Sequence, residues 1–181
     1  MKEILFVFVK LIAPFFFRKE YLKGKYFENS KVGWRWVAQG LFKQKILGFN
    51  KSIPWPINHT ITLSNWRNIE FHVDDLNNFQ SAGCYFQNFS GKIFLGKGCY
   101  IAPNVGLITS NHDLSNLDKH LEGKDIVLGK KCWIGMNSVL LPGVHLGDHT
   151  IVGAGSVVTK SFPQGKLVIA GNPAKVLKTI S

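Results

Sequence analysis

Cysteine is scarce in this sequence, and its spacing favours neither cross-linking nor metal binding. The 181 residues include three cysteines, Cys84, Cys99 and Cys132, and no pair has the CxxC spacing. An odd number without that spacing argues against a disulfide framework and against a zinc site. We therefore expect reduced thiols, and we expect Cys99 and Cys132 to be buried because a thiol packs as a small apolar group.

An apolar run long enough to cross a membrane is also absent. The run from Ile4 to Phe17 has 14 residues and is interrupted by Lys10 and Pro14. A membrane-spanning helix needs about 20 apolar residues, so this segment is too short to span. It also lacks the small-x-small cleavage site of a secretory signal peptide.

Acidic residues are few, and the basic excess is local. The chain has 22 Lys and Arg against 11 Asp and Glu, and residues 1–51 hold eleven basic residues against three acidic ones. Basic and aromatic residues alternate there, as in Trp34-Arg35-Trp36, which suits an anionic membrane interface. Two interpretations of residues 1–51 stay open: helices packed on the flank of the domain, or peripheral membrane contact at the inner face of the plasma membrane. No nucleic-acid-binding motif accompanies the charge, so we expect no nucleic-acid partner.

What the sequence does contain is a period of six. An aliphatic residue recurs at every sixth position in two blocks, and glycine directly follows several of these residues. The nine positions are Leu95, Ile101, Leu107, Leu128, Ile134, Leu140, Leu146, Val152 and Val158. A fixed period of six predicts a left-handed parallel β-helix, a triangular prism in which each hexapeptide forms one face. The aliphatic side chain points inward, and glycine fits the tight corner.

The two blocks are separated by a break in the period. Three hexapeptides from Leu95 make one coil of 18 residues that ends at His112, and the next position in register is Leu128. Residues 113–127 are therefore a polar insertion, and a long loop on a rigid scaffold commonly carries function. We expect residues 1–51 to form a helical, basic segment and 52–181 to form the prism, with an irregular first coil after Pro54-Trp55-Pro56.

Several motifs in the repeat resemble those of a known family, the hexapeptide-repeat acyltransferases, particularly the O-acetyltransferases of capsule and surface polysaccharides. The segments that carry the resemblance are Asn111-His112-Asp113, Cys132-Trp133-Ile134-Gly135, Leu141-Pro142-Gly143-Val144, Val152 to Lys160, and Ala170 to Lys175. The resemblance implies an all-β, left-handed β-helix with a short C-terminal helix. It implies a homotrimer of a cytoplasmic enzyme, acetyl-CoA as cosubstrate without a metal, and a glycan or sugar acceptor.

The same resemblance assigns roles to individual residues. His112 would be the general base, flanked by Asn111 and Asp113, and Trp133 would wall the acceptor and acetyl site. Coenzyme contacts are implied for Gly135, Met136, Ala154, Thr159, Lys160, Lys175 and Lys178. By the family's pattern, His112 of one subunit would face Trp133 or the coenzyme groove of the next.

The chemistry needs a base because a sugar hydroxyl is a very weak acid. Histidine takes up a proton near neutral pH, which suits the deprotonation of an attacking hydroxyl. Backbone N–H groups near Gly135 or Ser138 are candidates to stabilise the developing oxyanion. Two alternatives remain: a zinc-dependent carbonic anhydrase of the same fold with His112, His145 and His149 as ligands, and a non-catalytic membrane-attached scaffold.

Overall fold

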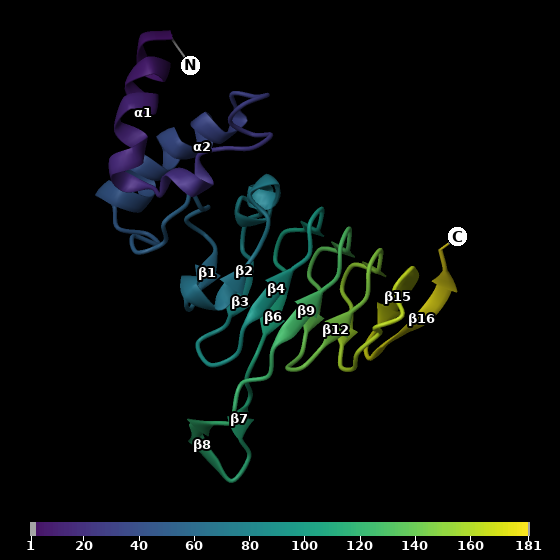
Figure 1. Cartoon of the computed structure of the whole chain (residues 1–181). Helices are drawn as coiled ribbons and strands as arrows, with labels where there is room; N and C mark the ends of the chain where they lie inside the picture. The colour runs from purple at the N-terminus through teal and green to yellow at the C-terminus, as the bar shows by residue number, and fades with distance from the viewer. Residues whose placement is uncertain (1–2, 181) are drawn as a thin grey trace.

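Three sheets of mainly parallel strands form the body of the protein in the computed structural model, which describes residues 3–180 (Figure 1). The first sheet contains β1 (Thr62–Leu63), β3 (Tyr85–Gln87), β6 (Gly106–Ile108), β11 (Val139–Leu140) and β14 (Val157–Val158). The second contains β5 (Tyr100–Ile101), β10 (Trp133–Ile134), β13 (Ile151–Val152), β15 (Leu167–Gly171) and β16 (Ala174–Thr179). The third contains β2 (Ile69–Glu70), β4 (Ile93–Leu95), β9 (Ile126–Leu128) and β12 (His145–Leu146).

The strand register confirms the six-residue period. Leu128 lies opposite Leu146 and Ile134 opposite Val152, so one coil has 18 residues. Leu95 lies opposite Leu128, which adds the 15 inserted residues to that coil. All nine predicted aliphatic positions are buried. Burial of each such side chain contributes about 1.5–3 kcal/mol, and this stacked column is the core of the prism.

Glycine lies at the corners because adjacent coils approach too closely for a side chain. A Cβ on Gly129 would lie 2.5 Å from the backbone N of Asp148, and one on Gly135 would lie 2.6 Å from that of Ala154. Both distances are below any ordinary contact, so these corners require glycine. The three cysteines are free and buried, which confirms the prediction for Cys99 and Cys132.

The first coil is irregular, as predicted. It includes the 3-10 helices η3 (Trp66–Asn68) and η4 (Val73–Phe79) between short strands. Trp55, between two prolines, is fully buried and contacts the rings of Phe71 and Phe79 at centroid distances of 5.0 and 5.1 Å. This aromatic cluster closes the N-terminal end of the prism.

The N-terminal region is helical and packs against that closed end. It comprises α1 (Glu3–Phe16), η1 (Lys19–Tyr21), α2 (Val32–Gly40) and the π-helix η2 (Leu41–Ile46). Val9, Ala13, Phe17, Trp34 and Val37 are buried members of the main core. Among residues 3–180, no helix has both the length and the apolar character needed to cross a membrane.

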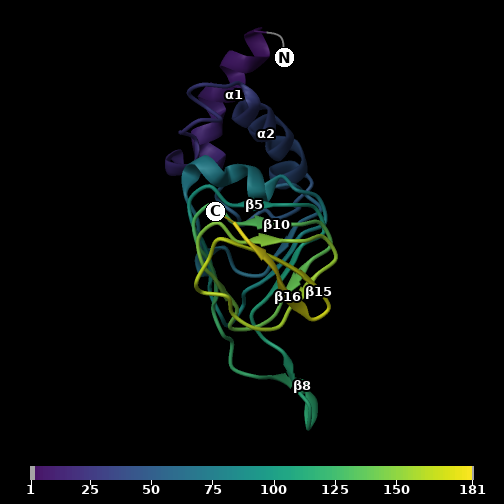
Figure 2. The ribbon, with the colours of Figure 1, turned by 90° about the vertical axis from the view of Figure 1, so that its right-hand side faces the viewer.

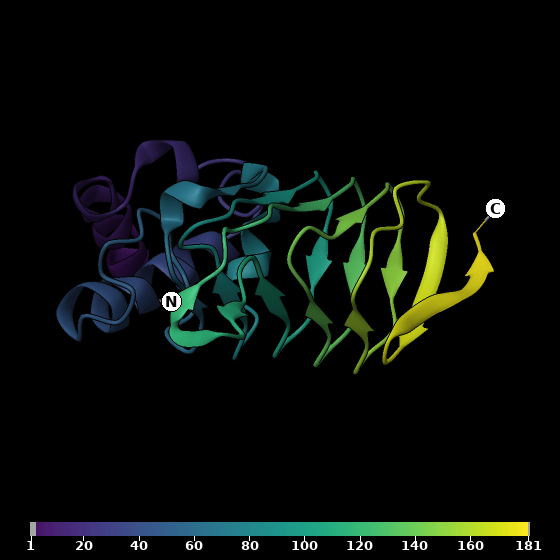
Figure 3. The same cartoon turned by 90° about the horizontal axis from the view of Figure 1, so that it is seen from below.

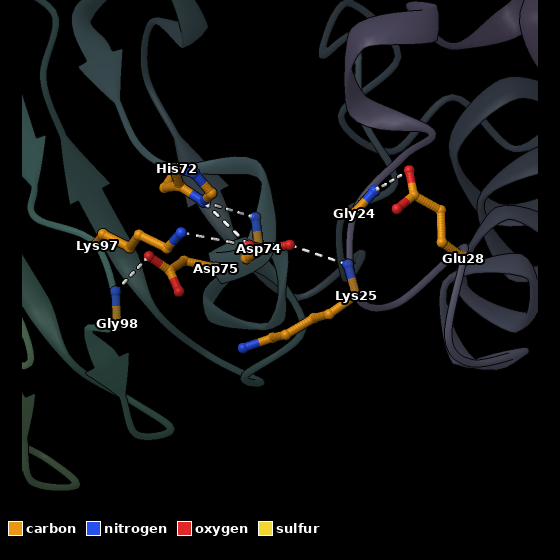
Figure 4. A network of polar contacts seen from close by, with 8 residues as sticks. All are labelled: Gly24, Lys25, Glu28, His72, Asp74, Asp75, Lys97 and Gly98. Carbon is orange, nitrogen blue, oxygen red and sulfur yellow. Dashed lines mark hydrogen bonds and ion pairs between the residues drawn. The ribbon is translucent and has the colours of Figure 1, made fainter.

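A polar network also fixes the N-terminal region to the first coils (Figure 4). The backbone N–H of Lys25 donates to Asp74 Oδ1 at 2.9 Å, and Lys97 Nζ lies 3.7 Å from Asp74 Oδ2. The Lys25 hydrogen bond is the main cause that lowers the pKa of the Asp74 carboxyl. The neighbouring Asp75 accepts from Gly98 N at 2.7 Å, while burial raises the pKa of its carboxyl.

The predicted C-terminal helix is wrong. Residues Ala174–Thr179 form β16, which pairs antiparallel with β15, with Lys175 opposite Ala170 and Lys178 opposite Val168. Without β16, the hydrogen-bonding edge of β15 would be open at the end of the second sheet. Pairing satisfies those backbone groups, whereas a helix of six residues is marginal in water.

Candidate active site

The insertion forms a hairpin that projects from one corner of the prism, between the first and third sheets (Figures 1 and 2). Its strands are β7 (His112–Asp113) and β8 (Asn116–His120), paired antiparallel. At its stem, Leu121 N donates to Asn111 O and Lys124 N donates to Thr109 O, both at 2.8 Å. The chain rejoins the prism at Ile126, which is buried in β9. The stem therefore holds the hairpin on a rigid base.

Gln87 positions that base from inside the prism. Its side chain is nearly buried, and Oε1 accepts from the N–H groups of Thr109 and Ser110 at 3.0 and 2.9 Å. Its Nε2 donates to Ser110 O at 3.0 Å. Gln87 thus fixes the residues directly before the hairpin, although it carries no repeat or motif that would indicate this role from sequence.

His112 has one ring nitrogen engaged and the other free of protein partners among the described residues. Nδ1 lies 2.6 Å from Leu117 O across the hairpin. A carbonyl oxygen only accepts, so Nδ1 carries the proton in the neutral ring and Nε2 keeps its lone pair. The side chain is exposed. The backbone therefore orients the His112 ring, and Nε2 stays available on an exposed side chain.

His120 lies directly against this ring. The two imidazoles have a centroid distance of 4.1 Å and an interplanar angle of 38°. Phe89 contacts His120 edge-on at 4.8 Å. The His112 ring therefore packs against His120 of β8, and Phe89 supports His120 from the other end of this cluster. The sequence pattern gives no indication of this pairing, because it depends on the hairpin register.

Asp113 shapes the hairpin turn. Its Oδ1 accepts from the backbone N and the Oγ of Ser115, at 2.8 and 2.6 Å. The hydrogen bond from the Ser115 hydroxyl is the main cause that lowers the pKa of this carboxyl. The Asp113 carboxylate therefore binds Ser115 of the hairpin turn.

Asn111 and Thr159 line one hollow beside the hairpin stem, with a volume of about 220 Å³. Its other lining residues are Leu121, Glu122, Lys124, Leu141 and Pro142. Thr159 and Leu141 follow adjacent strands of the first sheet, so they stack at the corner from which the hairpin leaves. The structure therefore brings one predicted coenzyme residue next to the predicted catalytic loop.

Trp133 lies on a different sheet from the hairpin. It belongs to β10 in the second sheet, pairs with Tyr100 of β5, and is 54% exposed. Seen along the prism, β5 and β10 lie on the side away from β8 (Figure 2). Within one chain, His112 and Trp133 therefore do not form one site.

Gly135, Met136 and Ala154 gather at the corner between the second and first sheets. Met136 and Ala154 are exposed there, and Met136 O accepts from Gly155 N at 2.8 Å. The N–H of Gly135 donates to Val152 O at 2.8 Å, and the N–H of Ser138 donates to Gly135 O at 3.3 Å. Of the backbone groups in the predicted oxyanion region, the N–H groups of Gly135 and Ser138 themselves are thus engaged within the coil.

The basic residues predicted to meet the nucleotide are spread over two places. Lys175 and Lys178 lie on β16 in the second sheet, and Lys160 lies at the hairpin corner with its Nζ over the Phe162 ring at 5.7 Å. Of the histidines considered as zinc ligands, His145 is exposed on β12, and His149 adopts a φ of 58° in the next corner. No group of three metal-ligating side chains is found within residues 3–180.

Part of the prism matches a known protein family. Residues 125–160 match the profile of the family described as bacterial transferase hexapeptide (six repeats). This part of the prism therefore matches the repeat of the hexapeptide transferases. The matched residues begin just before β9 and end just after β14. They include Trp133, the corner with Met136 and Ala154, and the corner with Leu141 and Thr159.

Two curated relatives and one solved structure show how far this likeness extends. Galactoside O-acetyltransferase of Escherichia coli (strain K12) is 39% identical over 92 residues, 49% of this chain and 45% of the relative. A protein of the same strain, provisionally named colanic acid biosynthesis acetyltransferase WcaF, is 39% identical over 88 residues, 49% of this chain and 48% of the relative. The chain thus matches about half the length of these two relatives.

The solved structure is a galactoside acetyltransferase in complex with coenzyme A. It is 30% identical, with a TM-score of 0.61, and the likeness covers 70% of this chain and 62% of that one. Hexapeptide-repeat neighbours of this kind imply that the parallel coil is left-handed.

Proposed function

We propose that this hexapeptide-repeat protein transfers an acetyl group from acetyl-CoA to a hydroxyl of a capsular or other surface polysaccharide, or of its sugar precursor. The names of the relatives support the reaction, since one acetylates galactosides and another is provisionally assigned to colanic acid biosynthesis. The coenzyme A complex of a structural neighbour supports the donor.

The hydrogen bond between His112 and Leu117 O is the observation that carries the catalytic part of this proposal. It leaves Nε2 as a free base on an exposed ring. In the proposed reaction, Nε2 removes the proton of the acceptor hydroxyl as its oxygen attacks the thioester carbonyl. The C–S bond then breaks, and the departing sulfur takes the proton from Nε2. General base catalysis of this kind contributes typically 10²–10⁴-fold.

Direct transfer within a ternary complex is the simplest course. The three cysteines are buried, so none is available to carry the acetyl group. Holding acceptor and donor together lowers the entropic cost of bringing the two reacting groups into contact. The oxyanion donor must come from a group other than the N–H of Gly135 or Ser138, which are engaged in the coil.

A second copy of the chain completes the proposed site. The hairpin that carries His112 and the strand β10 that carries Trp133 lie on different sides of one prism (Figure 2), and Trp133 is exposed although it is a large aromatic residue. In a cyclic trimer, the hairpin corner of one subunit would meet the second sheet of its neighbour. Trp133 of that neighbour would then wall the acceptor site opposite His112.

The coenzyme would lie along the same junction. A Cβ on Gly155 would meet nothing within 4 Å, so the corner with Met136 and Ala154 leaves room for a narrow chain such as pantetheine. Gly135 underlies that corner, while Thr159, Lys160, Lys175 and Lys178 would lie nearer the nucleotide. The lysines would bind phosphate as point charges and not as bidentate forks.

The test is incubation of the purified chain with acetyl-CoA and a panel of capsular and lipopolysaccharide glycans. We expect thiol release together with a single-acetyl mass increment on at least one glycan. A His112→Ala sample serves as the matched blank. Absence of both signals from every glycan and from simple hexosides would favour the scaffold alternative.

A further inference from the structure

Helix α1 is apolar on the side that faces away from the protein as well as on the side that packs against it. Ile4, Phe8, Leu11 and Phe15 follow the spacing i, i+4, i+7 and i+11, which forms one stripe along a helix. They are 87%, 55%, 70% and 84% exposed. Val9 and Ala13, on the opposite side, are buried. A helix that is apolar all round is ordinarily covered on both sides.

The uncovered surface continues beyond this stripe. Helix α1 contacts η2, and both lie at the end of the molecule opposite β16 (Figures 1 and 3). The further exposed apolar side chains in these segments and the turn that follows are Leu5, Val7, Phe16, Phe42, Ile46, Leu47 and Phe49. We call these seven residues and the stripe together the apolar end surface. Many exposed apolar side chains at one end of a molecule are typical of a protein or membrane interaction site.

A cationic groove lies at the C-terminal end of α1, beside the apolar end surface. Phe15 and Phe16 line it together with Arg18, Lys45 and Lys51, and its volume is about 330 Å³. Lys45 Nζ donates to Lys51 O at 2.8 Å, which holds the ammonium group at the groove. The three cations therefore stand next to exposed aromatic rings.

We propose that the apolar end surface docks on the interface of an anionic phospholipid bilayer, with Arg18, Lys45 and Lys51 meeting headgroup phosphates. Helix α1 has 14 residues, so it would lie in the plane of the interface over about 21 Å.

Charge decides between a bilayer and a second copy of the chain as the occupant. Residues 1–51 hold eleven basic residues against three acidic ones. Two such regions brought face to face would repel each other, whereas an anionic leaflet is complementary to each of them.

The test is co-sedimentation of the full chain with phosphatidylcholine vesicles with or without phosphatidylglycerol, at low and high salt. We expect binding to the anionic vesicles that weakens as salt screens the cations. Ile4→Glu/Leu11→Glu should weaken it at least tenfold, because both side chains would enter the interface. Lys51→Gln should weaken binding to anionic vesicles about fivefold, the effect of one basic residue at such a surface, and should leave binding to phosphatidylcholine alone unchanged.

The matched control is Leu114→Glu/Leu177→Glu, which alters two side chains of similar exposure, 94% and 66%, outside the apolar end surface. It should bind anionic vesicles like the unaltered chain. The proposal is wrong if the unaltered chain fails to bind anionic vesicles at low salt, or if the Ile4/Leu11 variant binds equally well. It is also wrong if that variant lowers the oligomeric mass in light scattering, because the surface would then join copies of the chain. None of these readouts requires acetyl transfer.

Discussion

The prism and the N-terminal region are both rich in apolar residues but differ in how far they bury them. In the prism, every aliphatic residue of the repeat is buried by the coil above or below it. In α1, the buried side holds Val9 and Ala13, while the opposite stripe has no cover within the described chain. The prism therefore buries its own apolar side chains, whereas α1 leaves an apolar surface that a binding partner could cover.

The largest expected effect concerns catalysis, which we place entirely in the prism. His112→Ala should lower kcat by 10²–10⁴-fold with little change in thermal stability, because the side chain is an exposed base. The measurement is steady-state acetyl transfer with a thermal melt of each variant. His145→Ala, an exposed histidine on β12, is the control and should retain full activity. Retention of more than about a tenth of kcat by His112→Ala would contradict the assignment.

The next prediction compares burial directly. Leu140→Ala in the prism should lower the free energy of unfolding by about 2–5 kcal/mol, since it leaves a cavity in a fully buried column. Leu11→Ala in α1 should change it by less than about 0.5 kcal/mol, because that side chain is 70% exposed. Urea unfolding of both variants measures the difference. Equal losses would mean that the α1 stripe is covered within the protein.

A smaller effect is expected at the coenzyme lysines. Lys160→Ala and Lys178→Ala should raise the KM for acetyl-CoA more than they lower kcat, because a phosphate contact contributes equally to ground and transition states. Steady-state titration of acetyl-CoA measures both constants. Lys23→Ala, an exposed lysine of the N-terminal region, provides the control. An unchanged KM in both prism variants would show that these lysines do not contact the coenzyme.

The smallest effect concerns the junction between the two regions. Because the folded-state pKa of Asp74 is lowered, its contribution is present above the unfolded-state pKa and is lost as pH falls through the folded-state pKa. Asp74→Asn should therefore lower the melting temperature at neutral pH and have little effect in strong acid. Because its partner Lys97 is largely exposed, solvent screening limits the change to about 1 kcal/mol or less. The measurement is the melting temperature of each variant from neutral pH to strong acid. Asp118→Asn, which removes an exposed carboxyl on the hairpin, is the control.

The sequence alone predicts the prism because the signal for it is the spacing of residues that are close along the chain. Side chains at a period of six must share the interior of a three-sided coil, so nine buried positions and the glycine corners follow from spacing. The break before Leu128 likewise predicted an excursion of the chain, and the structure shows the hairpin there. The sequence also predicts the helical N-terminal region, but an apolar run alone does not reveal whether its partner is the prism or a membrane.

Only the tertiary structure decided how these elements meet. Register within the hairpin brings Leu117 O and His120 to His112, and Gln87 reaches the hairpin base from the preceding coil. The period assigns residues to faces and so separates Trp133 from His112 within one prism, but it does not show which side chains lie against His112. The last strand shows the same limit: residues 174–179 became a strand because an open edge of β15 was beside them. Local spacing determines which residues are buried, and contacts between distant segments determine what the exposed ones can do.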